Sequence, residues 1–195
     1  MITTPIPSKF LTFEEFLDYD DGTETRYELE NGVLLEMPTE NTQNSDVAMI
    51  ILVELLKHFS CYLVRHKDIE VAVMGRRATC RMPDLLVHTE ESAAALVGAS
   101  RSLITLDMPS PALVIEVVSP GSSNRSRDYR YKRTEYAARQ IMEYWIVDPE
   151  QQQVTICKWI DGQYEDTIAS REDCLPSEVV PAWGLTVAQI FSRQR

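Results

Sequence analysis

The chain has few of the residues that mark zinc-stabilised or disulfide-stabilised domains. It contains four cysteines, and no two of them form a CxxC pair. Its three histidines form neither an HxH nor an HxxxH pair. Structural zinc sites need such closely spaced ligands, so we do not expect one here. We expect reduced cysteines that belong largely to the core.

Long apolar runs are also missing. No stretch of eighteen apolar residues occurs, and residues 1–10 lack a basic segment followed by an apolar one. Membrane-spanning helices and secretion signals require these patterns, so we expect a soluble cytoplasmic protein with no membrane partner. With 44% hydrophobic residues in 195, the chain can bury a core as one domain over residues 1–195.

Positive charge is scarce, because 19 Lys and Arg face 30 Asp and Glu and give a net charge of −11. Proteins that coat nucleic acid use many cationic contacts to phosphate, so any such contact must be local. The densest basic run, interleaved with Tyr129 and Tyr131, is Arg125, Arg127, Arg130, Lys132 and Arg133. It predicts either a phosphate-binding face or a solvated helix face. Arg76, Arg77 and Arg81 either extend that face or form an exposed hairpin.

Hydrophobic patterning predicts an α/β protein built around one sheet. A capping box from Thr12 to Glu15 predicts a short helix, and Asn31-Gly32 predicts a tight hairpin within residues 26–37. We expect longer helices over 45–63 and 126–139, a short helix with a loop over 91–108, and a final helix over 187–191. Strands are expected over 69–73, 82–87, 113–118 and 143–148, with a closing hairpin over 153–168.

Two acidic residues stand out within these strands. Asp84 begins one apolar strand, and Glu116 lies inside another, between Ile115 and Val117. A carboxylate in apolar surroundings must shift its pKa, meet a cation or bind a metal. A hard cation such as Mg²⁺ needs only a few oxygen ligands because it keeps several waters. The two residues therefore predict a metal site.

Each residue also has a purely structural interpretation. Asp84 can cap nearby amides at a strand start, and Glu116 can form a buried ion pair with an Arg or Lys. Lys132 and Asp128, four residues apart, can be an ordinary pair on a helix surface.

Four short motifs occur in order along the chain and together resemble one known family. They are Pro83-Asp84, Ile115-Glu116-Val117-Val118-Ser119-Pro120, Asp128-xxx-Lys132-xxx-Tyr136 and Glu143-Tyr144-Trp145-Ile146-Val147-Asp148. The series resembles the Uma-two family of restriction endonuclease-like proteins, within the PD-(D/E)XK nuclease superfamily. The resemblance implies a restriction endonuclease-like α/β core. Its central mixed sheet would be flanked by helices, with additional N-terminal and C-terminal hairpins.

The resemblance also implies a site. Asp84 and Glu116 would coordinate Mg²⁺ or Mn²⁺, with the backbone carbonyl of Val117 as a further ligand. The family's strand lysine falls at Val118, so Lys132 on the following helix would replace it and orient or help deprotonate the attacking water.

Other residues would support this site. Glu28 resembles the extra acidic residue of many superfamily members, and Asp128 and Tyr136 share the helix face of Lys132. A histidine typical of the family is replaced near Asn44-Ser45-Asp46. Arg125, Arg127, Arg130 and Arg133 would bind nucleic acid.

The expected function is therefore hydrolysis of phosphodiester bonds, with DNA as the first substrate to test. The alternative is an inactive scaffold that binds nucleic acid or forms oligomers and retains the nuclease fold. A glycosidase with two acids across a sugar cleft is a third, weaker interpretation. Exposed strand edges predict a homodimer.

Overall fold

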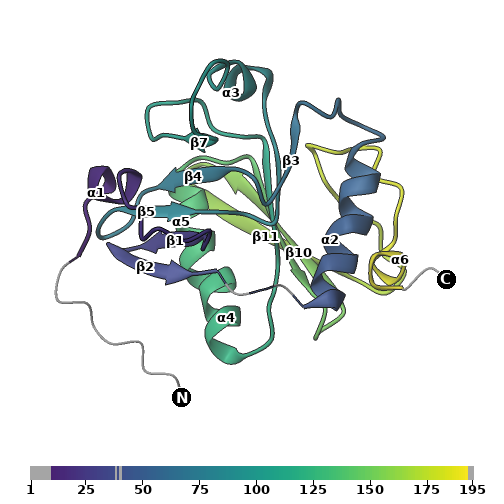
Figure 1. Ribbon diagram of the computed structural model, residues 1–195. Coiled ribbons are helices and arrows are strands. Elements are labelled where there is room, and N and C mark those ends of the chain that lie inside the picture. Colours follow the sequence, from purple (N-terminus) through teal and green to yellow (C-terminus); the bar gives the residue numbers. More distant parts are fainter. Residues whose placement is uncertain (1–9, 38, 40, 193–195) are drawn as a thin grey trace.

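Two mixed β-sheets organise the part of the chain that the computed structural model describes, which is residues 10–37, 39 and 41–192 (Figure 1). Residues 1–9, on which the expected absence of a secretion signal largely rests, lie outside it. Among the described residues, no helix combines the length and apolar content needed to cross a bilayer.

The larger sheet has six strands in the order β11-β10-β9-β8-β6-β3. Its strands are β3 (Val64–His66), β6 (Leu85–Val87), β8 (Leu113–Val117), β9 (Glu143–Asp148), β10 (Gln153–Ile160) and β11 (Gln163–Ser170). Strands β8 and β9 are parallel, and the other neighbours are antiparallel. A parallel pair needs a crossover connection, and the helical segment between β8 and β9 supplies it.

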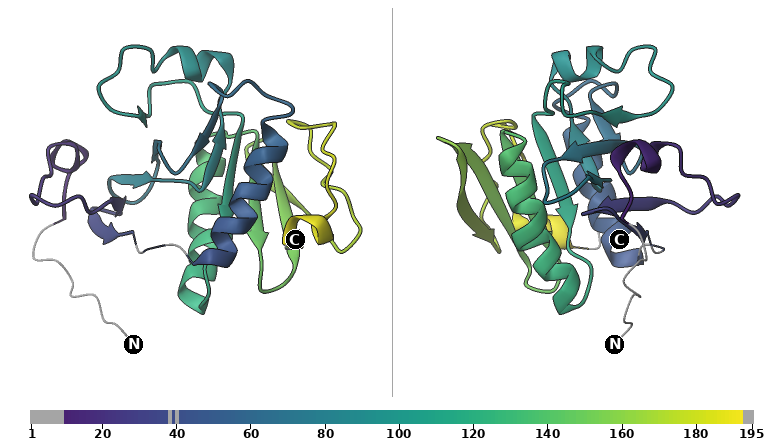
Figure 2. Two further views of the ribbon diagram at one scale, coloured as in Figure 1. Left: turned by 45° about the vertical axis from the view of Figure 1, so that its right-hand side comes forward. Right: turned by 90° about the vertical axis from the view of Figure 1, so that its left-hand side faces the viewer.

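Helices cover both faces of this sheet (Figure 2). On one face lie α2 (Thr42–Leu55) and α6 (Val187–Phe191), packed on odd-numbered residues of β6, β8 and β9. On the other lies a continuous helix made of α4 (Ser122–Ser126), the π-helical η1 (Arg127–Lys132) and α5 (Arg133–Ala138). Because side chains alternate along a strand, Glu116 projects toward this second face.

The smaller sheet has five strands in the order β2-β1-β5-β4-β7. Its strands are β1 (Tyr27–Glu30), β2 (Val33–Glu36), β4 (Glu70–Val73), β5 (Thr79–Arg81) and β7 (Leu103–Ile104). Helix α1 (Phe13–Leu17) packs on it through Phe16 against Leu29, while α3 (Glu90–Ala94) precedes β7. The predicted turn is present, because Asn31 and Gly32 take φ values of 50° and 82°.

Several boundaries differ from the sequence prediction. The strand expected over 82–87 is shorter in the structure, where β6 covers only Leu85–Val87. The preceding strand β5 was not predicted and belongs to the other sheet, so the strands form two sheets and not the expected one. Helix α2 begins at Thr42, where Asn41 caps it, and it ends at Leu55. Strands β3 and β7 were not predicted because they have only three and two residues, too few to show a hydrophobic period.

The register of β6 and β8 brings together two acidic residues that are distant in sequence. Leu85 pairs with Ile115 in this antiparallel ladder, so Asp84, just before Leu85, lies level with Glu116. Side chains of directly opposed residues share a face of the sheet. The fold therefore places both carboxylates beside the helix that contains Lys132.

Candidate active site

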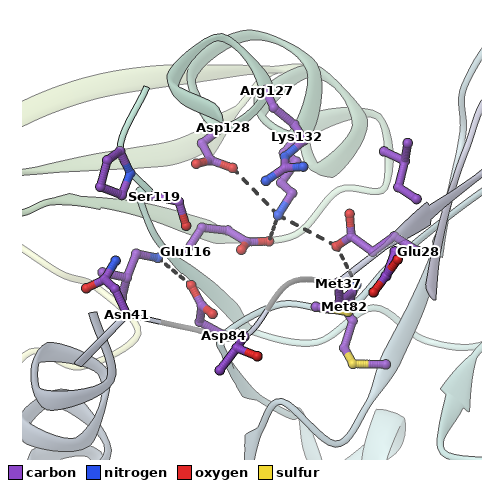
Figure 3. Close-up of a pocket in the computed structure, with 15 residues that line it drawn as sticks. Glu28, Met37, Asn41, Met82, Asp84, Glu116, Ser119, Arg127, Asp128 and Lys132 are labelled. Atoms are coloured by element: carbon purple, nitrogen blue, oxygen red, sulfur yellow. Dashed lines mark hydrogen bonds and ion pairs between the residues drawn. The ribbon is translucent and has the colours of Figure 1, made fainter. Parts of the chain in front are cut away.

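A pocket opens where β6, β8, the β1–β2 hairpin and the helix η1 meet (Figure 3). Half of its polar lining residues are acidic, and its cations are Lys132 and Arg127. Its lining includes Glu28, Met82, Asp84, Glu116, Val117, Arg127, Asp128 and Lys132.

Glu116 lies at the centre of this pocket. Its carboxylate is 2.8 Å from Lys132 Nζ, and it accepts a hydrogen bond of 2.8 Å from the Tyr136 hydroxyl. Burial raises the pKa of Glu116, and although Lys132 opposes the change, the carboxylates of Asp84 and Asp128 add to it. The pKa reaches about 8, because burial and the neighbouring carboxylates together outweigh the effect of the lysine.

Lys132 is 4% exposed and lies among three carboxylates. Its Nζ is 3.6 Å from Asp128 and 3.7 Å from Glu28, in addition to Glu116 (Figure 3). Burial lowers the pKa of Lys132, but the carboxylates outweigh burial and raise it. Lys132 is therefore a cation at neutral pH.

The helix around Lys132 presents the predicted face. Asp128, Lys132 and Tyr136 are four residues apart and all three are buried on the Glu116 side. The π-helical turn over Arg127–Lys132 was not predicted; such turns are frequent at functional sites. Val118 lies in the apolar cluster that contains Tyr136, so the helix and not the strand supplies the lysine.

Asp84 has different partners from those of Glu116. It accepts a 2.7 Å hydrogen bond from the backbone N–H of Val117, and Lys67 Nζ lies 3.1 Å from its other oxygen. Lys67 was not recognised in the sequence analysis. It is in the left-handed region at φ 53°, in the turn after β3, and no sequence motif marks it.

Glu28 joins this pocket to a second buried charge cluster. It accepts a 3.0 Å hydrogen bond from the Met82 backbone N–H and lies 3.3 Å from Arg81 Nη1. Although burial opposes the change, Lys132 and Arg81 lower the pKa of Glu28, so this carboxylate is ionised. The predicted supporting residue is thus on the pocket wall.

The surface position predicted for Arg81 is wrong. It is fully buried, and neither extends a basic surface nor belongs to an exposed hairpin. Its Nε and Nη2 donate to both oxygens of Glu135, at 2.8 and 2.9 Å, and its Nη1 donates to Glu30 at 2.7 Å. This cluster holds β1, β5 and α5 together behind the pocket.

Asn44, in the segment where the resemblance implied a replaced histidine, contacts the same strand end. Its Nδ2 donates to the carbonyl of Val118 at 3.2 Å and to that of Val117 at 3.4 Å. The side chain is buried and ties α2 to the end of β8. It therefore positions the carbonyl that was predicted as a metal ligand.

The four arginines predicted to bind nucleic acid do not form one uniform patch. Arg125 pairs with Asp148, and Arg133 donates to Asp166 and to the Tyr164 carbonyl. Arg130 is exposed.

Arg127 differs from the other three because it lines the pocket. Its buried Nε has no hydrogen-bond partner among the described residues. Arg127 therefore borders the pocket and has one donor that no described residue accepts.

The donor chemistry of the pocket fits a hard divalent cation. Asp84, Glu116 and the Val117 carbonyl offer oxygen atoms, and the raised pKa of Glu116 means that added positive charge would favour its ionised form. Within the described part of the chain, no three acidic, histidine or cysteine side chains are grouped as metal ligands. The predicted set has two carboxylates, and Mg²⁺ sites often contain no more because water completes them.

Comparisons with known proteins agree with this fold. A crystal structure titled as "a putative nuclease belonging to DUF820" from Anabaena variabilis ATCC 29413 superposes with a TM-score of 0.70. It is 16% identical, and the match covers 93% of this chain and 97% of that one. At this identity the likeness establishes the fold. No curated protein matches the sequence significantly.

A family model extends the comparison to sequence. The model described as "Uma2: Putative restriction endonuclease" matches residues 13–188, which include every site residue named above. The match confirms the resemblance found in the motifs. The chain belongs to the Uma2 family.

Proposed function

We propose that the chain is a divalent-metal-dependent endonuclease that hydrolyses phosphodiester bonds, with DNA as its substrate. The family and the fold support a nuclease. The observation that carries the proposal is the buried contact of Lys132 with Glu116, opposite Asp84, at the bottom of an acidic pocket.

Asp84, Glu116 and the Val117 carbonyl would hold Mg²⁺ or Mn²⁺. When bound, the ion supplies Lewis acidity and positive charge at the phosphate that is cleaved. Asp84 is held by the Val117 N–H, and Tyr136 holds Glu116, so both carboxylates are fixed before substrate arrives.

Lys132 would act as a fixed positive charge. Its raised pKa keeps it protonated, so it is better suited to orient the attacking water and stabilise developing negative charge than to remove a proton. Asp128 and Glu28 keep the amine in place from two other sides.

Among the four arginines, Arg127 is the strongest candidate for a phosphate contact. It lines the pocket and has an unpartnered Nε among the described residues. Arg125 and Arg133 would have to leave carboxylate partners, and Arg130 is exposed on the same helix. We expect them to contribute less.

The direct test is nicking of supercoiled plasmid DNA with Mg²⁺ or Mn²⁺ by the wild type and by Asp84→Asn. We expect the substitution to reduce the rate at least about a hundredfold. The control is Asp161→Asn, an equivalent change at an exposed turn far along the chain. Equal cleavage by Asp84→Asn and wild type would rule out this site.

The second candidate is an inactive scaffold that retains the nuclease fold. Two features favour it: Val118 stands where the resemblance implies a strand lysine, and Lys67 and Lys132 already neutralise the two candidate ligands. It predicts salt-sensitive DNA binding with no cleavage, and no metal binding by calorimetry. The homodimer and the cytoplasmic location remain predictions.

A further inference from the structure

A second pocket adjoins the candidate active site. Met82 lines both pockets, and Lys67 lines the second while its amine contacts Asp84 in the first. The second pocket lies between the start of the β1–β2 hairpin, the segment after α1 and the turn that joins β3 to β4. A nucleic-acid strand that leaves the active site past Met82 would therefore enter this second pocket.

Cations and carboxylates line this pocket unequally. Arg26, Lys67 and Arg101 outnumber Asp68 and Glu70, which is a local reversal in an acidic protein. The guanidinium of Arg101 is occupied, because it donates to both oxygens of Glu70 at 2.5 and 2.7 Å. Lys67 is paired with Asp84 of the first pocket, so Arg26 is the remaining cation of the second pocket.

Arg26 is the cation best placed for a ligand. It is exposed, and its Nη1 donates to the Lys67 carbonyl at 2.7 Å, which fixes the side chain beside the turn that contacts Asp84. An arginine has five N–H donors, and this is the one hydrogen bond of the Arg26 side chain seen among the described residues. The remaining donors suit a phosphate group.

Two tyrosines give the same pocket an aromatic wall. The Tyr27 hydroxyl is hydrogen-bonded to Asp21 at 2.7 Å, and the ring of Tyr19 meets that of Tyr27 edge-on, at 5.7 Å and 87°. Tyr19 is 42% exposed although it is a large aromatic residue. An exposed ring supported by a fixed one is a platform on which a base can stack.

We propose that this second pocket binds an unpaired nucleotide of the nucleic-acid strand that enters the active site. Arg26 contacts its phosphate, and Tyr19 stacks on its base. Bases in a duplex already stack on each other, whereas an unpaired base offers its face to an aromatic side chain. The inference rests on the proposed function and adds a preference for substrates with a single-stranded segment.

The test is fluorescence anisotropy in EDTA, with a labelled DNA hairpin that has either a single-stranded tail or a blunt end. We expect the wild type to bind the tailed hairpin more tightly, and Tyr19→Ala to weaken that binding about tenfold without affecting the blunt hairpin. Tyr19→Phe should bind as the wild type does. Tyr62→Ala, at another exposed tyrosine, is the matched control.

Arg26→Gln has a second readout. Loss of one phosphate contact should reduce the slope of log affinity against log salt by about 0.7 for a single strand. A purely structural role of Arg26 would leave that slope unchanged. Arg171→Gln, at an exposed arginine in the turn that follows β11, should leave both affinity and slope unchanged.

Binding and cleavage can fail separately. No preference of the wild type for the tailed hairpin, or an undiminished preference in Tyr19→Ala, would overturn the inference even if the protein cleaves DNA. A tail preference that depends on Tyr19 would support the pocket even if no cleavage occurs, and the proposed nuclease function would then fail alone.

Discussion

Glu143 and Glu116 are buried glutamates on neighbouring parallel strands, β9 and β8, yet their surroundings differ. Glu143 accepts hydrogen bonds from Trp145 Nε1 at 2.9 Å, from the Ser177 hydroxyl at 2.7 Å and from the Glu178 backbone N–H at 2.6 Å. These neutral donors satisfy the carboxylate and fix the C-terminal segment on the sheet. Glu143 illustrates the structural role that a strand carboxylate can have.

Glu116, in contrast, has charged neighbours. It faces Lys132 and Tyr136, but Asp84 and Asp128 are also close enough to raise its pKa. It also lines a pocket, so solvent, a metal ion or substrate can approach this group of charges. Burial is similar for the two glutamates, so the nature of the neighbouring groups is what separates a structural carboxylate from a candidate catalytic one.

We expect the largest effect on the free energy of unfolding from removing Lys132, the cation beside Glu116. Lys132→Met leaves Glu116 and Asp128 buried without their counter-charge, so the free energy of unfolding at pH 8 should fall by about 3–5 kcal/mol. Urea unfolding measures the change. Lys158→Met, which removes a partner of the exposed Glu178, should cost less than about 1 kcal/mol. Equal losses in the two variants would contradict the account.

The next effect concerns the structural glutamate. Glu143→Ala leaves several buried donors without an acceptor, and we expect a loss of about 3 kcal/mol in the free energy of unfolding. Glu172→Ala, at an exposed position, should stay within about 0.5 kcal/mol of wild type. A loss below 1 kcal/mol in Glu143→Ala would show that its hydrogen bonds are dispensable.

The smallest of the three effects is a pH dependence. The pKa of Glu116 rises from 4.5 in its ordinary state to about 8 in the fold, so the folded protein keeps a proton that the unfolded chain releases. The contribution of Glu116 to the free energy of unfolding is therefore largest below pH 4.5 and is lost as the pH rises through 8.

Glu116→Gln should therefore remove about 2 kcal/mol of the stability decline between pH 6 and pH 8. Lys132 does not interfere, because its pKa is raised from 10.5 and its titration lies above this range. Thermal or urea unfolding at several pH values gives the comparison. Parallel stability profiles for wild type and Glu116→Gln would refute a raised pKa.

Much of the fold and part of the site could be predicted from local sequence. The spacing of Asp128, Lys132 and Tyr136 gave one helix face, and the positive φ values of the first hairpin turn followed from Asn31-Gly32. These features depend on residues a few positions apart, where helix and turn geometry apply directly.

Other features depend on tertiary pairing, which local patterns do not contain. The contact of Lys67 with Asp84 requires the turn after β3 to meet the start of β6. The burial of Arg81 depends on Glu135, which lies 54 residues later. The family resemblance predicted that Asp84 and Glu116 lie close together, and the β6–β8 register gives the physical basis of this proximity.

The measurement that tests the central claim most directly is metal-dependent nicking of supercoiled DNA by Glu116→Gln, after circular dichroism has shown that the variant is folded. Glutamine keeps the shape of the side chain and its contact with Tyr136 but removes the charge that would hold the ion. The account predicts a rate at least about a hundredfold below that of the wild type with Mg²⁺ or Mn²⁺. A rate within a few fold of the wild type would contradict it.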